Sequence, residues 1–158
     1  METLLVHEDA AAEFLPQMLT EYFAAGVTII GCGKTQAFDK RIQAATEADW
    51  GTEYGDLRLS VKIVSGLEEA LAHIAKYGTK HSECIVTSDY NHARTFQQRV
   101  DAAAVYVNAS TRFTDGGEFG LGAEIGISTQ KLHVRGPFAL DALTSSKYLI
   151  DGDGQVRS

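Results

Sequence analysis

The sequence has few cysteines, no long apolar run and a shortage of positive charge, and each absence excludes a class of protein. Two cysteines in 158 residues are too few for a disulfide framework. No run approaches the ~20 apolar residues of a membrane-spanning helix. The first residues lack the basic segment and apolar core of a secretory signal. We therefore expect a cytoplasmic protein, with the length of one domain and no membrane-bound part.

Acidic residues outnumber basic ones by 21 to 14, and the formal net charge is -7. Lysine and arginine form no stripe along the chain. Binding to nucleic acid without sequence preference depends on neutralising phosphates, so this charge balance argues against a nucleic-acid partner. The apolar share of 44% is typical of a soluble globular protein.

Segments with the composition of strands alternate with segments of helical spacing, which predicts an α/β fold. Strands are expected at 2–7, 27–30, 57–63, 83–87, 103–107 and 146–150. In the third of these, Arg58, Ser60 and Lys62 alternate with apolar residues, which predicts a half-exposed strand.

The most informative stretch begins where the expected strand 103–107 ends. An amide, two hydroxyls and a guanidinium follow at Asn108, Ser110, Thr111 and Arg112. Open α/β sheets bind ligands at the carboxyl ends of their strands. Glycines at 116, 117, 120, 122 and 126 then indicate positive φ angles or close approach of other groups. A long hairpin or an oligomer-facing loop without a ligand is the alternative interpretation.

Two glycine motifs are incomplete. Gly31-Cys32-Gly33-Lys34-Thr35 ends like a phosphate-binding loop, but Thr28 stands where that loop needs a glycine. A turn leaving a strand is the better interpretation. Gly120-Leu121-Gly122 lacks the third glycine of a dinucleotide fingerprint, because Ile125 occupies its position.

Metal-capable side chains occur in one region without a metal-binding spacing. His73, His81, Cys84 and His92 match no zinc pattern, so we expect no metal site. Cys84 and Cys32 lie in or beside apolar strands without an electropositive neighbourhood, which predicts inert thiols.

Four stretches, in the family's order, resemble γ-glutamyl phosphate reductase, also called glutamate-5-semialdehyde dehydrogenase. They are Thr46–Tyr54, Val64–Ile85, Asn108–Gly126 and Lys131–Pro137. This family belongs to the aldehyde dehydrogenase superfamily. The resemblance therefore implies an open, mostly parallel sheet flanked by helices, with a C-terminal strand for oligomerisation.

The resemblance also implies an activity. The family reduces γ-glutamyl phosphate to glutamate 5-semialdehyde and phosphate with NADPH, in proline biosynthesis. A cysteine displaces the phosphate and forms a thioester, which hydride then reduces. In the family this cysteine and the NADP-binding domain precede the stretch that resembles residues 2–7. We therefore expect the nucleophile upstream of Met1, no catalytic residue within this chain and no activity from the chain alone.

Site residues follow from the resemblance position by position. Asn108, Ser110, Thr111 and Arg112 match the loop that faces the substrate, and hydroxyls with a guanidinium suit a carboxylate and a phosphate. Glu53 resembles the glutamate that contacts the nicotinamide ribose. Phe119-Gly120 resembles a turn near the mouth of the active site, which makes Phe119 a second candidate for cofactor binding.

The implied organisation is a catalytic half at 1–145 and an oligomerisation strand with a tail at 146–158. Pairing of residues 146–150 with a neighbouring subunit implies a homo-oligomer. Two other functions stay open. One is a non-catalytic binding or oligomerisation module of the same fold. The other is an acid–base hydrolase, which needs two of Glu118, Glu124 and His133 within about 3.2 Å of a common ligand atom.

Overall fold

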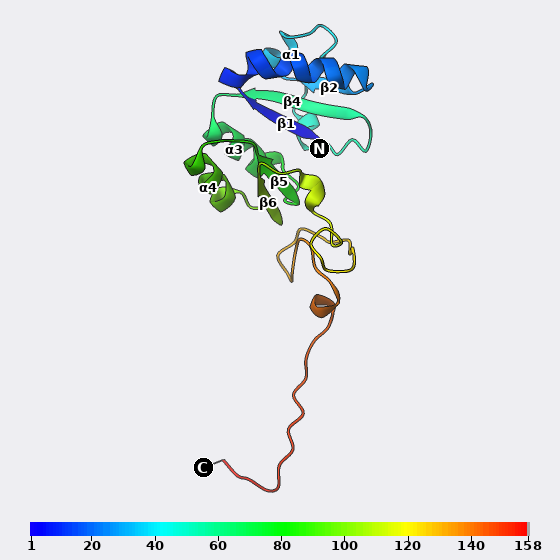
Figure 1. Ribbon diagram of the computed structural model, residues 1–158, viewed down its shortest axis with the longest axis vertical. Coiled ribbons are helices and arrows are strands. Elements are labelled where there is room, and N and C mark those ends of the chain that lie inside the picture. Colours follow the sequence, from blue (N-terminus) through cyan, green and yellow to red (C-terminus); the bar gives the residue numbers. More distant parts are fainter. Residues whose placement is uncertain (158) are drawn as a thin grey trace. The chain divides into compact units, whose positions relative to one another are not determined.

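The structure, a computed structural model, describes residues 1–157 and has α/β architecture (Figure 1). The chain divides into two compact units, residues 1–111 and residues 112–158, and each is described by itself. No helix of the described residues is long and apolar enough to cross a membrane.

The first unit contains a four-stranded sheet of order β1-β4-β2-β3, in which every pair of neighbours is parallel. Its strands are β1 (Thr3–His7), β2 (Thr28–Gly31), β3 (Gln43–Ala44) and β4 (Arg58–Val64). The helix α1 (Glu8–Ala24) connects β1 to β2, and α2 (Gly33–Gln36) follows β2 at once. Parallel strands need such crossover connections.

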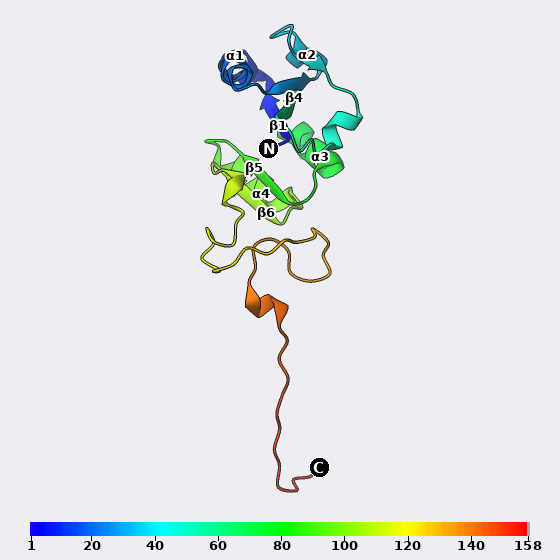
Figure 2. The ribbon, with the colours of Figure 1, turned by 90° about the vertical axis from the view of Figure 1, so that its right-hand side faces the viewer.

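The spacing of apolar residues in α1 explains which of its sides is buried. Ala11, Leu15, Met18 and Leu19 are buried at helical intervals and belong to one core with the strands of the first sheet. Figure 2 shows α1 end-on beside this sheet. The segment of helical spacing expected between the strands at 2–7 and 27–30 is confirmed as a helix, although Phe14, one of its apolar residues expected to face the core, is 44% exposed.

The prediction of a half-exposed strand at 57–63 is wrong. The strand β4 lies between β1 and β2, and its residues Leu59, Ser60 and Val61 are all buried. Ser60 escapes the cost of a buried hydroxyl because it bonds to the segment that precedes the strand. Lys62 is partly covered and pairs with Glu69 at 3.0 Å.

A smaller parallel sheet pairs β5 (Ser82–Ile85) with β6 (Ala104–Val107), also within the first unit. The helix α3 (Leu67–Tyr77) precedes β5, and α4 (Tyr90–Arg99) connects β5 to β6. Leu71, Phe96 and Val100 form the buried centre between these elements. This β-α-β arrangement leaves the carboxyl ends of both strands side by side.

The second unit contains little regular structure. A 3₁₀ turn, η2 (Thr111–Phe113), spans the boundary between the units, and another, η3 (Leu140–Leu143), follows Pro137. The strand expected at 146–150 is absent, because residues 144–157 contain neither helix nor strand. A strand needs a hydrogen-bonding neighbour, and no strand among residues 1–157 pairs with this segment. A functional boundary between 145 and 146 stays a prediction.

Candidate active site

The polar segment 108–112 leaves β6 at the carboxyl end of the smaller sheet, as predicted. Ile85 and Val107 are the last paired residues of the two strands. The amide of Asn108 then donates to the carbonyl of Ile85 at 2.9 Å, which extends the pairing by one bond. The Cys84 thiol donates to the carbonyl of Ala109 at 3.0 Å and holds the next residue.

The side chain of Asn108 connects the segments that follow β5 and β6. Its side-chain oxygen accepts from the Thr87 amide, and its side-chain nitrogen donates to the Thr87 carbonyl, both at 2.8 Å. Its φ of 54° lies in the left-handed region, where asparagine is tolerated better than most residues. The structure thus places Asn108 as a bridge between the ends of β5 and β6, and contact with a substrate stays a prediction.

The following residues are open to solvent. Ser110 and Arg112 are exposed, and Thr111, which begins η2, is half-buried. Hydroxyls and a guanidinium therefore occur together on a short segment that starts from a rigid strand end. Such a segment can bind anionic groups such as carboxylate or phosphate.

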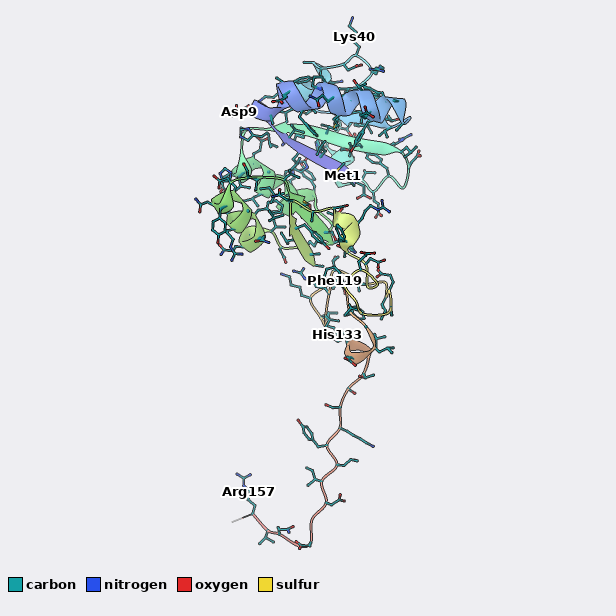
Figure 3. The ribbon with its side chains drawn as sticks, viewed as in Figure 1. Met1, Asp9, Lys40, Phe119, His133 and Arg157 are labelled. Carbon is teal, nitrogen blue, oxygen red and sulfur yellow. The ribbon has the colours of Figure 1, made fainter. Side chains whose placement is uncertain are left out.

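The glycine-rich loop of the second unit contains both predicted reasons for glycine, which are close approach of another group and a positive φ. Gly116 is buried, and a Cβ atom there would overlap the carbonyl oxygen of Ala123. The amide of Gly116 also donates to the carboxylate of Glu124. Gly120 has a φ of 72°, which favours glycine. Phe119, labelled in Figure 3, precedes this turn and is 51% exposed.

The carboxylate of Glu124 thus closes the glycine-rich loop. An acid–base hydrolase would need two of Glu118, Glu124 and His133 within about 3.2 Å of a common ligand atom. His133 is labelled in Figure 3. This alternative stays a prediction.

Glu53 lies in the first unit, on the approach to β4, and its side chain is exposed. The segment around it is held by hydrogen bonds. Asp49 accepts from the Thr46 amide at 2.7 Å and from the Tyr54 hydroxyl at 3.0 Å. The Tyr54 hydroxyl also shares a hydrogen bond of 2.9 Å with the hydroxyl of Ser60. Glu53 precedes β4 of the four-stranded sheet, whereas the 108–112 segment follows β6 of the two-stranded sheet.

The Gly31–Thr35 stretch is a strand exit rather than a phosphate loop, as preferred above. Thr35 is buried, and its hydroxyl donates to the Val61 carbonyl at 3.1 Å. The Lys34 ammonium pairs with the Glu8 carboxylate at 3.1 Å. These interactions hold the stretch against β4 and the start of α1.

The sequence predicts an inert thiol at Cys32, and the structure adds hydrogen bonds around this thiol that the sequence does not show. Burial raises the pKa of this thiol, but a hydrogen bond shared with the Thr35 hydroxyl and hydrogen bonds from nearby backbone amides lower the pKa by more. The net pKa of Cys32 is therefore below its usual value. These amides became visible only with the fold, because they include that of Ile63 on β4.

Metal binding has no geometric support within residues 1–157, which contain no group of three or more His, Cys, Asp or Glu side chains able to hold an ion. Sequence reasoning also missed a group of aromatic rings. His73 contacts both Trp50 and Tyr77. All three residues belong to motifs quoted above, but nothing in their spacing shows that residues 50 and 73 touch.

Comparison with known proteins finds strong similarity to part of one group of enzymes. The chain is 62% identical over 157 residues to γ-glutamyl phosphate reductase of Moorella thermoacetica, covering 99% of this chain and 38% of that protein. A crystal structure of γ-glutamyl phosphate reductase from Thermotoga maritima matches with a TM-score of 0.91 and 54% identity, over 99% of this chain and 38% of that one. In sequence and in fold, this chain matches part of the γ-glutamyl phosphate reductase family.

A more distant match supports the fold alone. An acetylating aldehyde dehydrogenase from Geobacillus thermoglucosidasius has a TM-score of 0.50 and 16% identity, over 78% of this chain and 35% of that one. A comparison with profiles of protein families finds no match. The chain spans about 38% of the length of the γ-glutamyl phosphate reductases named here.

Proposed function

We propose that this chain forms the substrate-facing part of the catalytic domain of a γ-glutamyl phosphate reductase. The whole enzyme would reduce γ-glutamyl phosphate to glutamate 5-semialdehyde and release phosphate, in proline biosynthesis in the cytoplasm. The observation that supports this most is the 108–112 segment at the carboxyl end of β6, in which Asn108, Ser110 and Arg112 are exposed, within a fold that matches the Thermotoga maritima reductase at a TM-score of 0.91.

The side chains of that segment suit an anionic substrate. The planar guanidinium of Arg112 can form two parallel hydrogen bonds with a carboxylate or a phosphate. The hydroxyls of Ser110 and Thr111 can donate to the remaining oxygens. In this proposal Asn108 keeps the start of the segment in place through its bonds to Thr87.

Two residues suit a nicotinamide cofactor. The exposed carboxylate of Glu53 can accept hydrogen bonds from ribose hydroxyls, and its segment is held at Asp49 and Tyr54. The half-exposed ring of Phe119 can pack on a flat apolar surface. NADPH, when bound, supplies the hydride, and these residues would bind and orient it.

The nucleophilic cysteine of the reaction lies, in this proposal, outside the 158 residues. The Cys84 thiol is engaged with the Ala109 carbonyl, and Cys32 lies at the carboxyl end of β2 in the other sheet. The chain alone is then inactive. Its residues 1–145 contribute to catalysis, and residues 146–158 join subunits of a homo-oligomer.

A chimaera tests this proposal. The matching stretch of the Thermotoga maritima reductase is replaced by the whole of this chain, and phosphate-dependent reduction of NADP⁺ by glutamate 5-semialdehyde is measured. We expect activity from the chimaera, and a KM for phosphate or for the semialdehyde raised roughly 10- to 100-fold in Arg112→Ala. Arg112→Lys tests the need for a planar group. A folded but inactive chimaera, or turnover by the chain alone, contradicts the proposal.

A second candidate is an oligomerisation module without chemistry. It is favoured by three consecutive apolar side chains, Tyr148, Leu149 and Ile150, which are all at least 80% exposed. Light scattering of the chain and of its residues 1–145 tests it. A chain that self-associates only with the tail, but does not bind γ-glutamyl analogues, supports this candidate over the first.

A further inference from the structure

His73 of α3 is buried in an unusual way. The residue is only 6% exposed, yet no other described residue forms a hydrogen bond with either of its ring nitrogens. A buried polar group without a hydrogen-bond partner costs free energy. A phenylalanine at this position would avoid that cost, because its side chain has no polar atom. The role of this imidazole therefore lies in the contacts of its ring with neighbouring side chains.

The ring touches two aromatic side chains. The Trp50 indole and the imidazole form a T-shaped pair with centroids 5.4 Å apart and an interplanar angle of 79°. The Tyr77 ring is tilted by 49° against the imidazole, with centroids 4.7 Å apart. The T-shaped contact with Trp50 fixes ring orientation as well as distance. Trp50 belongs to the 3₁₀ turn η1 (Ala48–Gly51), three residues before Glu53.

Other contacts hold the two ends of the same segment, residues 46–54. At the α3 side, the Glu47 carboxylate accepts hydrogen bonds from the Lys76 ammonium and the Tyr77 hydroxyl. At the β4 side, Tyr54 bonds to Asp49 and Ser60, as described above. Trp50 lies in the sequence between these two ends and its indole contacts His73, so the orientation of the indole limits the backbone that leads to Glu53.

We propose that His73 is a positioning residue, which fixes the Trp50 ring and through it the orientation of Glu53 on the segment 46–54. This proposal rests on the proposed function, because it takes Glu53 as a contact of the cofactor. His73 itself touches neither substrate nor cofactor in this proposal.

The contact depends on the charge of the imidazole. Burial, followed by the nearby Lys62 ammonium of β4, lowers the pKa of His73 to about 4. Glu69 of α3 and Glu47 raise this pKa, and Lys76 of α3 lowers it, all by smaller amounts. The ring is therefore neutral at pH 7. Protonation would place a positive charge, with no described hydrogen-bond acceptor, against the Trp50 and Tyr77 rings.

Trp50 is the only tryptophan of the chain, which makes its fluorescence a direct probe that needs no activity. A protonated imidazole in contact with an indole quenches its emission. We expect the emission of the 158-residue chain to fall with a midpoint near pH 4, while circular dichroism shows a folded chain. His73→Phe should abolish this transition and keep the native emission maximum at pH 7. His73→Ala should shift that maximum to longer wavelength.

An exposed histidine of α4 provides the matched control, because His92→Ala should leave the emission and its pH profile unchanged. A profile that is flat between pH 3 and 6 in a folded wild-type chain overturns the proposal. An emission maximum that His73→Ala does not move also overturns it.

The second test uses the chimaera and separates this proposal from the proposed function. Glu53→Gln and His73→Ala should each raise the KM for NADP⁺ about tenfold and leave the KM for phosphate unchanged. The double variant should be no worse than Glu53→Gln, since one effect acts through the other. His73→Phe should restore most of the wild-type KM.

The other outcomes distinguish a failure of the positioning role of His73 from a failure of the cofactor role of Glu53. If Glu53→Gln raises the KM for NADP⁺ but His73→Ala does not, or if the two effects multiply, His73 does not position Glu53 and the cofactor role of Glu53 stands. If Glu53→Gln leaves the KM unchanged, the cofactor role of Glu53 fails and the positioning proposal fails with it.

Discussion

Asn108 joins the ends of two parallel strands by bonding both backbone groups of a single residue, Thr87. The two hydrogen bonds are each 2.8 Å long, and the φ of Asn108 is 54°. A residue at this position must offer both a donor and an acceptor and must tolerate the left-handed region. Asparagine meets both demands, which explains its place at the start of the candidate substrate segment.

Replacing this asparagine should loosen the strand ends. Asn108→Ala loses both bonds and strains the backbone, so we expect a loss of about 2 kcal/mol in the free energy of unfolding. Asn108→Gly removes the strain and should cost only about 1 kcal/mol. Urea denaturation measures both. Asn91→Ala, at an exposed position of α4, is the control, and an equal effect of all three substitutions would contradict this account.

Thr35 should control both stability and the thiol of Cys32. Thr35→Val keeps the shape of the buried side chain but removes one of the two donors to the Val61 carbonyl, the Cys32 amide being the other, which should cost about 1 kcal/mol. It also removes the hydroxyl that lies 3.2 Å from the Cys32 sulfur and lowers its pKa. The pKa of Cys32 should therefore rise.

Alkylation at several pH values, mapped to Cys32 by mass spectrometry, measures this rise. Thr35→Ser keeps the hydroxyl and should keep the low pKa. An unchanged pKa in Thr35→Val would show that backbone amides alone set it.

Gly116 and Gly126 should respond very differently to a methyl group. Gly116→Ala places Cβ against the Ala123 carbonyl, so the glycine-rich loop has to rearrange, at a cost of about 1–3 kcal/mol. Around Gly126 the space is open and its φ is not positive, so Gly126→Ala should be neutral. Hydrogen exchange of residues 112–126 measures the loop directly. Equal protection in both variants would refute the packing described for Gly116.

Glu83 should make the chain less stable as the pH rises from about 4.5 to 7. Burial raises the pKa of this β5 carboxyl from 4.5 to about 7. Between these values the folded state binds more protons than the unfolded state, so the stability present below pH 4.5 is lost as the pH passes 7. Its partial exposure limits the effect to the order of 1–2 kcal/mol.

Glu83→Gln cannot titrate and should remove that slope. The comparison is urea denaturation of both proteins at pH 5 and pH 7.5, with Glu118→Gln, an exposed carboxylate, as the control. The account of Glu83 fails if wild type and Glu83→Gln lose the same stability over this interval.

Local patterns predicted those elements whose partners lie close in the sequence. The helix after β1 and the strands β5 and β6 occur within a few residues of their expected positions. The strand β4 shows the limit of such patterns. Ser60 looks like an outward-facing residue, but its bonds to Asp49 and Tyr54 let it be buried. Alternation in sequence records polarity, and only the fold shows whether a polar side chain finds a partner.

The tail shows a different limit. Tyr148, Leu149 and Ile150 have the composition of a strand, yet they form none in the chain. β-Structure depends on a neighbouring strand for its hydrogen bonds, whereas a helix makes them within its own segment. Pairing of this tail with another copy stays a prediction.

The α/β class, the family resemblance and the polar segment after β6 were determined by the sequence itself, because composition, period and order along the chain are local properties. The tertiary structure alone decided that Asn108 bonds to Thr87, that Thr35 lowers the pKa of Cys32, and that His73 meets Trp50. Each of these depends on two segments meeting in space. Such meetings result from the packing of the whole fold, which no short stretch of sequence specifies.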